Sequence, residues 1–345
     1  MPGPQRLMLR VDGERIVAAD CQTGLHARGC ADRLRQTKLI QCYPLVNHVC
    51  GVHSHHHALV WTMALEELAQ IAPPPRANVL RTLVAESERI ASHLYHAARV
   101  VRLLGLDVIF QRLIVLREAA LQACQLLTGH RMVHDFVRPG GVQDDLHRDE
   151  VRELDARLAT SATELGRILG ALLRSRSLRR RTEQVGVLDP RVLVRLGAGG
   201  WIGRAAGRSD DLRRDQPYGA YPAALLEGVA YLGGGVYARL LTLLAEAYES
   251  ATISRRILAE LPATRWRGDL LDTAPAGMAT AAVEAPSGPL TYSLTSDGSR
   301  LTDVAIHSAQ AHSPALLREA LCGALVDDAE LIAASLAVCS ACAEL

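Results

Sequence analysis

The chain is poor in aromatic residues and has no long uncharged apolar run. Aromatic side chains make up 4% of its 345 residues, too few to suggest the base-stacking surfaces of single-stranded nucleic-acid binding proteins. The most apolar stretch, residues 97–116, is interrupted by charged side chains and does not resemble a transmembrane helix. The N-terminal residues lack the basic-then-apolar pattern of a signal peptide. These absences favour a soluble protein on the cytoplasmic side.

The chain also lacks an excess of charge of either sign. Lysine and arginine total 38 and aspartate and glutamate 37, a formal net charge of +1. No overall field therefore attracts nucleic acid or an anionic membrane. The basic run at 174–181 is typical of a solvated or partner-facing helix edge. We expect no nucleic-acid partner.

What the chain does have is helical periodicity, which predicts a mainly α, long-helix bundle as a single domain over 1–345, with small β elements near both termini. Its predicted parts are a β hairpin at 6–20, a helical core at 54–260, a small β region at 279–307 and a C-terminal tail at 327–345. Within the core, helices are predicted from Ser54 as N-cap to the prolines at 73–75, and at 76–104, 107–128, 146–180 and 222–260, the last as one or two helices. No GxGxxG motif follows a strand, which argues against a dinucleotide-binding fold.

Two pairs of residues have metal-ligand spacing. Cys50 and His53 precede the first core helix, and Cys339 and Cys342 lie near the C-terminus. Three thiolates and one imidazole form a tetrahedral set suited to zinc, and soft enough for nickel or iron. The alternative is that the pairs coincide by chance. A helix starting at Ser54 is expected to lower the Cys50 pKa.

The other cysteines and the adjoining histidines have less specific interpretations. Single cysteines in a reducing compartment are expected to be small core residues, and this group comprises Cys21, Cys30, Cys42, Cys124 and Cys322. His55, His56 and His57 occupy one helical turn and cannot all face one ion.

A series of segments, in order along nearly the whole chain, resembles one protein family. They are VDGERIV (11–17), VCGVHSHHHALVWTMALEEL (49–68), PPRANVLRTLVAESERIASHL (74–94), DLRRDQPYGAY (211–221), EAPSGPLTYSLTSDGSR (284–300) and LIAASLAVCSAC (331–342). The chain resembles the large subunit of nickel–iron hydrogenases, especially the energy-converting, membrane-associated branch, and the related 49-kDa (D-type) component of respiratory complex I.

The resemblance implies a metal site. In the hydrogenase branch two CxxC pairs hold nickel, and two of the thiolates bridge to an iron. The resemblance thus implies that Cys50, Cys339 and Cys342 are ligands and that His53 replaces the fourth cysteine. A nickel–iron centre is one expectation for this site, and zinc or no metal is the alternative. His57 and the pair Glu88 and Arg89 match family residues expected to pack or to form hydrogen bonds.

Other positions depart from the family pattern. Ala31 stands where the family places a proton-relay glutamate, Ser287 replaces an arginine that overhangs the metal, and 337–338 lacks the usual Asp-Pro. Arg28 and Asp32 remain as candidate catalytic groups, and Arg28 is alternatively a contact to an iron–sulfur partner or a surface salt bridge. These departures argue against ordinary hydrogen cleavage.

The resemblance also implies an assembly. The expected partners are an iron–sulfur small subunit carrying a 4Fe-4S cluster (of the hydrogenase kind or the B-type of complex I), a protein like the C-type component of complex I, and membrane subunits. The complex I quinone-contacting HPxxHG loop is missing, and Leu345 stands where hydrogenase precursors are cleaved. We expect a large subunit of a membrane-associated oxidoreductase, cytoplasmic and peripheral on the inner membrane face through its partners. The alternative is a non-catalytic structural subunit of such a complex.

Overall fold

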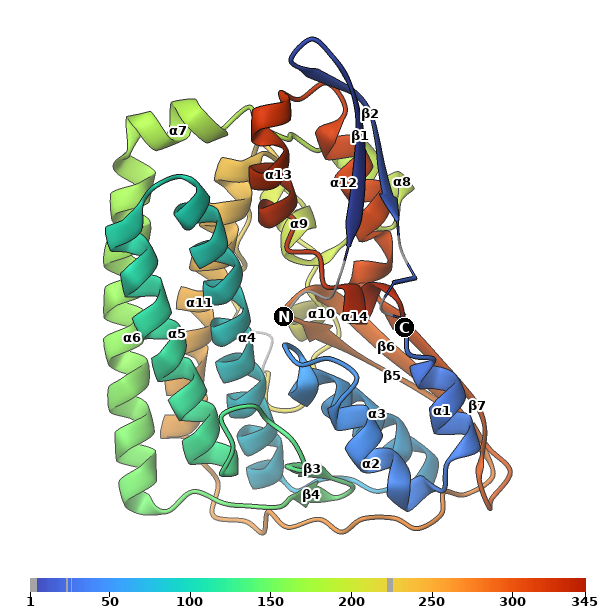
Figure 1. The fold of residues 1–345 in the computed structure, drawn as a ribbon. Coiled ribbons are helices and arrows are strands. Elements are labelled where there is room, and N and C mark those ends of the chain that lie inside the picture. The colour runs from blue at the N-terminus through green and yellow to red at the C-terminus, as the bar shows by residue number, and fades with distance from the viewer. Residues whose placement is uncertain (1–4, 23, 26, 222–225) are drawn as a thin grey trace.

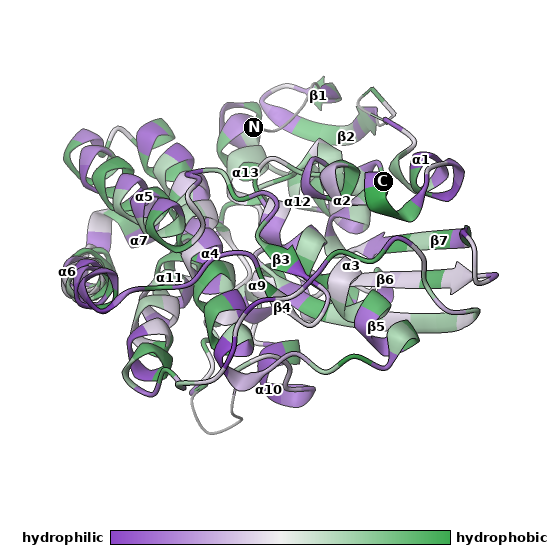
Figure 2. Cartoon of the chain, turned by 90° about the horizontal axis from the view of Figure 1, so that it is seen from below, coloured by the Kyte–Doolittle hydropathy of each residue, from purple (hydrophilic) through white to green (hydrophobic). Residues whose placement is uncertain are grey.

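The computed structural model describes residues 5–22, 24–25, 27–221 and 226–345. Long helices lie on one side of the molecule, and a three-stranded sheet with its covering helices lies on the other (Figures 1 and 2). The predicted mainly α architecture with small β elements near both termini is confirmed.

Four long helices form the bundle, α4 (Pro75–Leu103), α5 (Asp107–Thr128), α6 (Arg148–Arg174) and α11 (Val236–Ala259). Helix α4 packs against α5 and α11, and α11 packs against α6. The prolines before α4 fix its start, and Gly129, in the left-handed region at φ 77°, ends α5. The helices predicted at 76–104 and 107–128 are confirmed.

Two helix predictions are wrong in part. The segment 146–180 is two helices, because extended Ser175 ends α6 and its side chain caps α7 (Arg176–Thr182) through the Leu178 N–H. In the segment 222–260 only α11 is helical among the described residues, since 226–235 is irregular and 222–225 lies outside the described part.

Helix α3 (Ser54–Ala69) also starts differently from the prediction. Its N-cap is His53, and the Ser54 hydroxyl instead donates to the carbonyls of Asn47 and Val133 at 2.6 and 2.5 Å. Ser54 therefore ties the start of α3 to two neighbouring segments and does not cap it.

The β elements are antiparallel. Strands β1 (Arg6–Asp12) and β2 (Arg15–Gln22) form the predicted hairpin, and β5 (Gly277–Ala285), β6 (Gly288–Ser296) and β7 (Leu301–Ser308) form a sheet in that order. Helix α3 packs on β5 and β6. A short pair, β3 (Val137–Arg138) and β4 (Gly141–Val142), follows α5.

The remaining elements are short. They are α1 (Cys30–Gln36), α2 (Leu39–Asn47), α8 (Pro190–Arg195), α9 (Gly200–Ala205), α10 (Leu212–Asp215), η2 (Ala309–His312), α12 (Ser313–Leu321), η3 (Val326–Asp328), α13 (Ala329–Ser335) and α14 (Ser340–Ala343).

One large hydrophobic cluster joins the bundle to the sheet. Helix α6 covers one side of this cluster. The buried residues of α6 repeat at helical spacing, and the surface that α6 presents in Figure 2 is largely hydrophilic. Of the five single cysteines, Cys42 and Cys124 are buried as predicted, Cys21 and Cys30 are half-buried, and Cys322 is exposed, which corrects the core assignment. No helix in the described ranges is both long and apolar enough to cross a bilayer.

Candidate metal centre

The two predicted ligand pairs meet, although almost three hundred positions separate them in the sequence. Cys50 lies in the loop between α2 and α3, and Cys339 and Cys342 flank the start of α14. Each of the three cysteines and His53 is at most 3% exposed. The three cysteines form a small buried cluster of their own, separate from the main core.

The spacing of the donor atoms suits a single ion. The Cys50 and Cys339 sulfurs are 3.7 Å apart, and the Cys342 sulfur lies 3.8 Å from His53 Nδ1. The donor atoms of Cys50, His53 and Cys342 all lie within 4.8 Å of one another. Ligands bound tetrahedrally at about 2.0–2.3 Å are separated by about 3.3–3.8 Å. The donor atoms of Cys50, His53 and Cys342 therefore fit a single ion, and the Cys339 sulfur adjoins this group through its contact with Cys50.

The candidate ligand His53 is held in a suitable orientation. His53 Nε2 lies 3.1 Å from the Ser92 hydroxyl of α4. When Nε2 carries the proton and donates to Ser92, the Nδ1 lone pair faces the Cys342 sulfur and is available to a metal. Burial lowers the His53 pKa to about 4, so the ring is neutral at pH 7, as a ligand must be.

The C-terminal pair has its own support. The Cys339 N–H donates to Gln310 Oε1 at 3.0 Å, and the Ser313 hydroxyl donates to the same oxygen at 2.7 Å. Ala337, two residues before Cys339, adopts the left-handed conformation at φ 51°. This conformation costs a non-glycine residue about 1 kcal/mol or more, and it turns the chain out of α13 toward α14.

The loop that carries Cys50 is held by Arg28. Its guanidinium donates to the carbonyl of His48 at 3.0 Å and to that of Val49. The motif position of Arg28 predicted catalysis, a partner contact or a surface salt bridge; in the structure its guanidinium binds the loop that carries Cys50.

The first N–H groups of α3 contact Glu88 of α4. The first N–H groups of α3, at His55 and His56, donate to the Glu88 carboxylate at 2.9 and 3.2 Å. They are therefore not aimed at Cys50, and the predicted lowering of the Cys50 pKa is wrong. That pKa is raised to about 12, mainly by the hydrogen bond with Cys339.

The three thiols share their protons unequally. Hydrogen bonds with Cys342 and Cys50 lower the pKa of Cys339, and the contact with Cys339 raises the pKa of Cys342. Cys339 is therefore the most readily ionised of the three thiols. Binding of a divalent ion would release the protons of the thiols that it binds.

His57 contacts the site from the side. Its Nδ1 lies 2.8 Å from the Tyr292 hydroxyl, and its Nε2 lies 3.5 Å from the Cys342 sulfur. Burial lowers its pKa to about 3. A neutral ring that accepts from Tyr292 presents an Nε2 proton to the sulfur, in line with the predicted hydrogen-bonding role of His57.

The other candidate catalytic group is not at the site. Asp32 is 62% exposed by side chain and forms an ion pair with Arg35 on the surface of α1. The half-buried Ala31 beside it carries no titratable group, and Ser287 lies buried between β5 and β6.

Three supporting residues were not predicted from the sequence, namely Gln310, Ser92 and Tyr292. Gln310 of η2 and Ser92 of α4 reach the candidate ligands Cys339 and His53, and Tyr292 of β6 reaches His57 beside Cys342. These elements are distant in sequence from the Cys-x-x-His and Cys-x-x-Cys pairs. The regular alternation of β6, in which Tyr292 is an inward position, was the one available signal.

A buried ionic network lies on the other side of α4. Arg204 donates to Glu246 at 2.6 Å and to Glu284 at 2.9 Å, and Arg213 forms ion pairs with Asp211 at 2.7 Å and with Glu86 at 3.2 Å. We call these six residues the ionic network. His93 Nε2 joins it through Glu246, at 2.8 Å.

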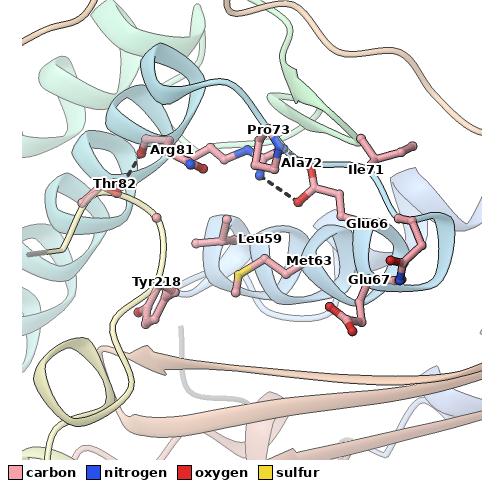
Figure 3. Close-up of a pocket in the computed structure, with 13 residues that line it drawn as sticks. Leu59, Met63, Glu66, Glu67, Ile71, Ala72, Pro73, Arg81, Thr82 and Tyr218 are labelled. Carbon is pink, nitrogen blue, oxygen red and sulfur yellow. Dashed lines mark hydrogen bonds and ion pairs between the residues drawn. The ribbon is translucent and has the colours of Figure 1, made fainter.

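Another cavity lies at the end of α3 that is opposite the loop carrying Cys50. It has a volume of about 420 Å³, and Figure 3 shows Met63, Glu66, Arg81 and Tyr218 around it. Glu66 accepts two hydrogen bonds from Arg81, at 2.6 and 3.0 Å. The two most buried charged groups of this cavity, Glu66 and Arg81, are thus paired with each other. None of the four candidate metal-ligand residues lines the cavity.

The protein is mainly helical and contains a buried set of Cys and His donors. These donors come from the N-terminal and the C-terminal parts of the chain. Comparisons with known proteins agree. Residues 104–271 match the family described as respiratory-chain NADH dehydrogenase, 49 Kd subunit. The carbon monoxide-induced hydrogenase of Rhodospirillum rubrum is 29% identical over 99% of this chain and 95% of its own length.

Two further relatives come from other kinds of complex. NADH-quinone oxidoreductase subunit 4 of Thermus thermophilus is 29% identical over 75% of this chain, and the match spans 63% of that relative. A chain of the membrane-bound sulfane sulfur reductase, an archaeal respiratory membrane complex, superposes with a TM-score of 0.91 at 26% identity, covering 98% of this chain and 94% of the other. In sequence and in fold the chain is thus similar to hydrogenase large subunits and to the complex I 49-kDa subunit.

Proposed function

We propose that the chain is the large, catalytic-type subunit of a hydrogenase-related or complex-I-related membrane-associated oxidoreductase, and that Cys50, His53, Cys339 and Cys342 hold its metal. The observation that carries this proposal is that the donor atoms of Cys50, His53 and Cys342 lie within 4.8 Å of one another in a buried cluster, with the Cys339 sulfur 3.7 Å from that of Cys50. When bound, a nickel–iron centre supplies redox chemistry at the thiolates.

The residues around the site have definable tasks under this proposal. Arg28 and Ser54 hold the loop that carries Cys50, and Gln310 positions Cys339. Burial excludes water from the sulfurs, and His57 holds a proton at Nε2 beside Cys342. The replacement of one thiolate by His53 makes the donor set less negative and less soft than four cysteines.

The proposed partners follow from the relatives. An iron–sulfur small subunit with a 4Fe-4S cluster would approach the loop at His48 and Gly51, which are exposed next to buried Cys50. A protein like the C-type component of complex I, together with membrane subunits, would place the assembly on the inner face of the cytoplasmic membrane. The relatives are named as a hydrogenase, a quinone oxidoreductase and a sulfane sulfur reductase, so hydrogen, quinone and sulfane sulfur are the substrates to assay.

One specific observation favours a second candidate, a structural subunit with zinc or no metal. Ala31 and Ser287 remove the family's proton relay and its arginine, and Asp32 does not replace the relay because it is paired on the surface. Such a chain would keep the fold for assembly alone.

Metal analysis separates the two candidates. The chain would be purified under reducing conditions, co-expressed with its neighbouring small subunit, together with Cys50→Ser and Cys342→Ser. Cys124→Ser is a matched control, because Cys124 is a buried cysteine outside the cluster.

The proposed catalytic-type subunit predicts nickel and iron near one equivalent each, infrared bands of metal-bound carbonyl and cyanide, and loss of the metals in both cluster variants but not in the control. Stoichiometric zinc without those bands, or no metal, would support the structural subunit instead.

A further inference from the structure

A second cavity lies directly behind the metal-ligand loop. It has a volume of about 250 Å³ and is enclosed by the loop at 51–54, by α4, by α5 and by the segment 131–133. Ser92, which contacts the ligand His53, is in its wall. Most of the wall is apolar, formed by Val52, Ala91, Leu121, Cys124, Met132 and Val133.

One charged group in this wall lacks an acceptor among the described residues. Arg117 of α5 is half-buried, and its Nε–H is fully buried without a hydrogen-bond acceptor. No carboxylate of the described residues forms an ion pair with it, and its guanidinium lies 5.4 Å from the Tyr95 ring centroid. A buried N–H donor without an acceptor destabilises the protein, and a bound acceptor would remove that cost.

The other charged groups of the cavity are already paired. Glu88 accepts from the backbone N–H groups of His55 and His56 and lies 2.5 Å from His56 Nδ1. Arg131 forms an ion pair with Glu118 at 2.6 Å. Glu88 and Arg117 line the same cavity and yet do not pair with each other. Arg117 thus has no ion-pair partner among the described residues, and Glu88 is the one acidic side chain on the same wall.

We propose that this cavity binds a small, weakly hydrated monoanion, such as hydrosulfide, thiocyanate or bromide, against Arg117. The guanidinium supplies the charge and the buried Nε–H donor. The apolar wall selects for weak hydration, because a strongly hydrated anion would lose more in leaving water. The volume admits an ion of a few atoms.

The proposed anion site lies next to the proposed metal centre. Its walls include Gly51 and Val52, between the ligands Cys50 and His53, so an anion there lies beside the metal centre. Its relevance to turnover rests on the proposed function, but anion binding itself does not require a metal.

The test uses the co-expressed complex, titrated with thiocyanate at constant ionic strength by calorimetry. Arg117→Gln removes the proposed contact, and Arg112→Gln is the control, since Arg112 lies on the same helix and pairs at the surface with Glu164 at 3.5 Å. We expect one bound thiocyanate, at least tenfold weaker binding in Arg117→Gln, and unchanged binding in Arg112→Gln. No binding by the parent complex, or equal loss in both variants, overturns the proposal.

Two further variants make the outcome independent of folding and of the metal. Ala91→Leu fills the cavity and leaves Arg117 in place, so it should also abolish binding. Cys342→Ser should retain binding, because the anion is held by Arg117. Loss of binding in Cys342→Ser would show that thiocyanate had bound to the metal, and would overturn the anion site without affecting the proposed metal centre.

Discussion

Helix α4 separates two buried regions of ionisable side chains. The two regions avoid the cost of buried charge in different ways. On one side, the histidine region contains His53, His55, His56, His57 and His96, all at most 5% exposed. On the other side is the ionic network, in which carboxylates and guanidiniums neutralise one another. The first region is kept neutral by burial, and the second is charged but internally paired.

The difference between the regions separates a binding site from a structural one. The ionic network offers no free group to a ligand, because each of its guanidiniums contacts at least two carboxylates. The histidine region and the adjoining cysteines hold soft donors within reach of one ion. Under the proposed function, a metal ion would complete this group.

Acid provides the strongest way to break this comparison. Burial lowers the pKa of His53 and His55 to about 4 and of His57 and His96 to about 3, against 6.5 when unfolded. Because these pKa values are lower in the folded state, the unfolded chain binds more protons below pH 6.5. The free energy of unfolding is therefore highest above pH 6.5 and decreases as the pH falls toward 4. At pH 5 each histidine costs about 2 kcal/mol, and the four together on the order of 8 kcal/mol.

This prediction is measured by urea unfolding of the metal-free protein at pH 7.5, 6.5, 5.5 and 5.0. His96→Gln removes one titrating ring and should reduce the pH dependence by about one proton. Unfolding free energies that stay constant down to pH 5 would show that the imidazoles are already charged or hydrated in the folded state.

Breaking the ionic network has the next largest expected effect. Arg204→Ala leaves Glu246 and Glu284 buried without their counter-ion, and we expect a loss of about 3–5 kcal/mol in the free energy of unfolding. The surface pair of Arg195 and Glu319 provides the control, because Arg195→Ala should cost less than about 1 kcal/mol. Similar losses in both variants would contradict a charged, desolvated network.

The sequence could predict the parts of this molecule that depend on local spacing. Helical periodicity located α4 and α5, and two-residue gaps located the pairs Cys50/His53 and Cys339/Cys342. The break at Ser175 was missed, because a single extended serine does not interrupt the apolar repeat on either side.

What the sequence could not predict depends on pairing between distant segments. Glu88 accepts from the first turn of α3, and Arg28 reaches the carbonyls at 48–49, although each could equally have faced solvent or a partner. Ser92 and Gln310 are ordinary residues of amphipathic elements until the fold brings them to His53 and Cys339. These roles depend on the direction in which each side chain points toward a distant segment. The spacing of residues within one segment does not determine that direction.

A smaller change sharpens the metal-site half of the comparison. Ser92→Ala removes the hydroxyl that orients His53, and we expect metal affinity to fall by 10- to 100-fold, the usual effect of losing a group that orients a ligand. Affinity would be measured by competition with a chelator, using zinc. Ser87→Ala is the control, since its hydroxyl bonds the Leu83 carbonyl of the same helix. Equal affinities in the two variants would mean that packing alone holds His53.

The smallest expected effect concerns the chain from Tyr292 through His57 to Cys342. Tyr292→Phe removes the 2.8 Å hydrogen bond to His57 Nδ1, and we expect a loss of about 1 kcal/mol in the free energy of unfolding. Tyr43→Phe is a matched control, because buried Tyr43 accepts from the Leu271 N–H away from the site. In protein loaded with cobalt, Tyr292→Phe should also shift the thiolate-to-metal absorption band, since His57 no longer keeps its proton on Nε2 beside the sulfur. A stability loss like that of Tyr43→Phe, with no spectral shift, would show that Tyr292 supports the fold without reaching the metal ligand.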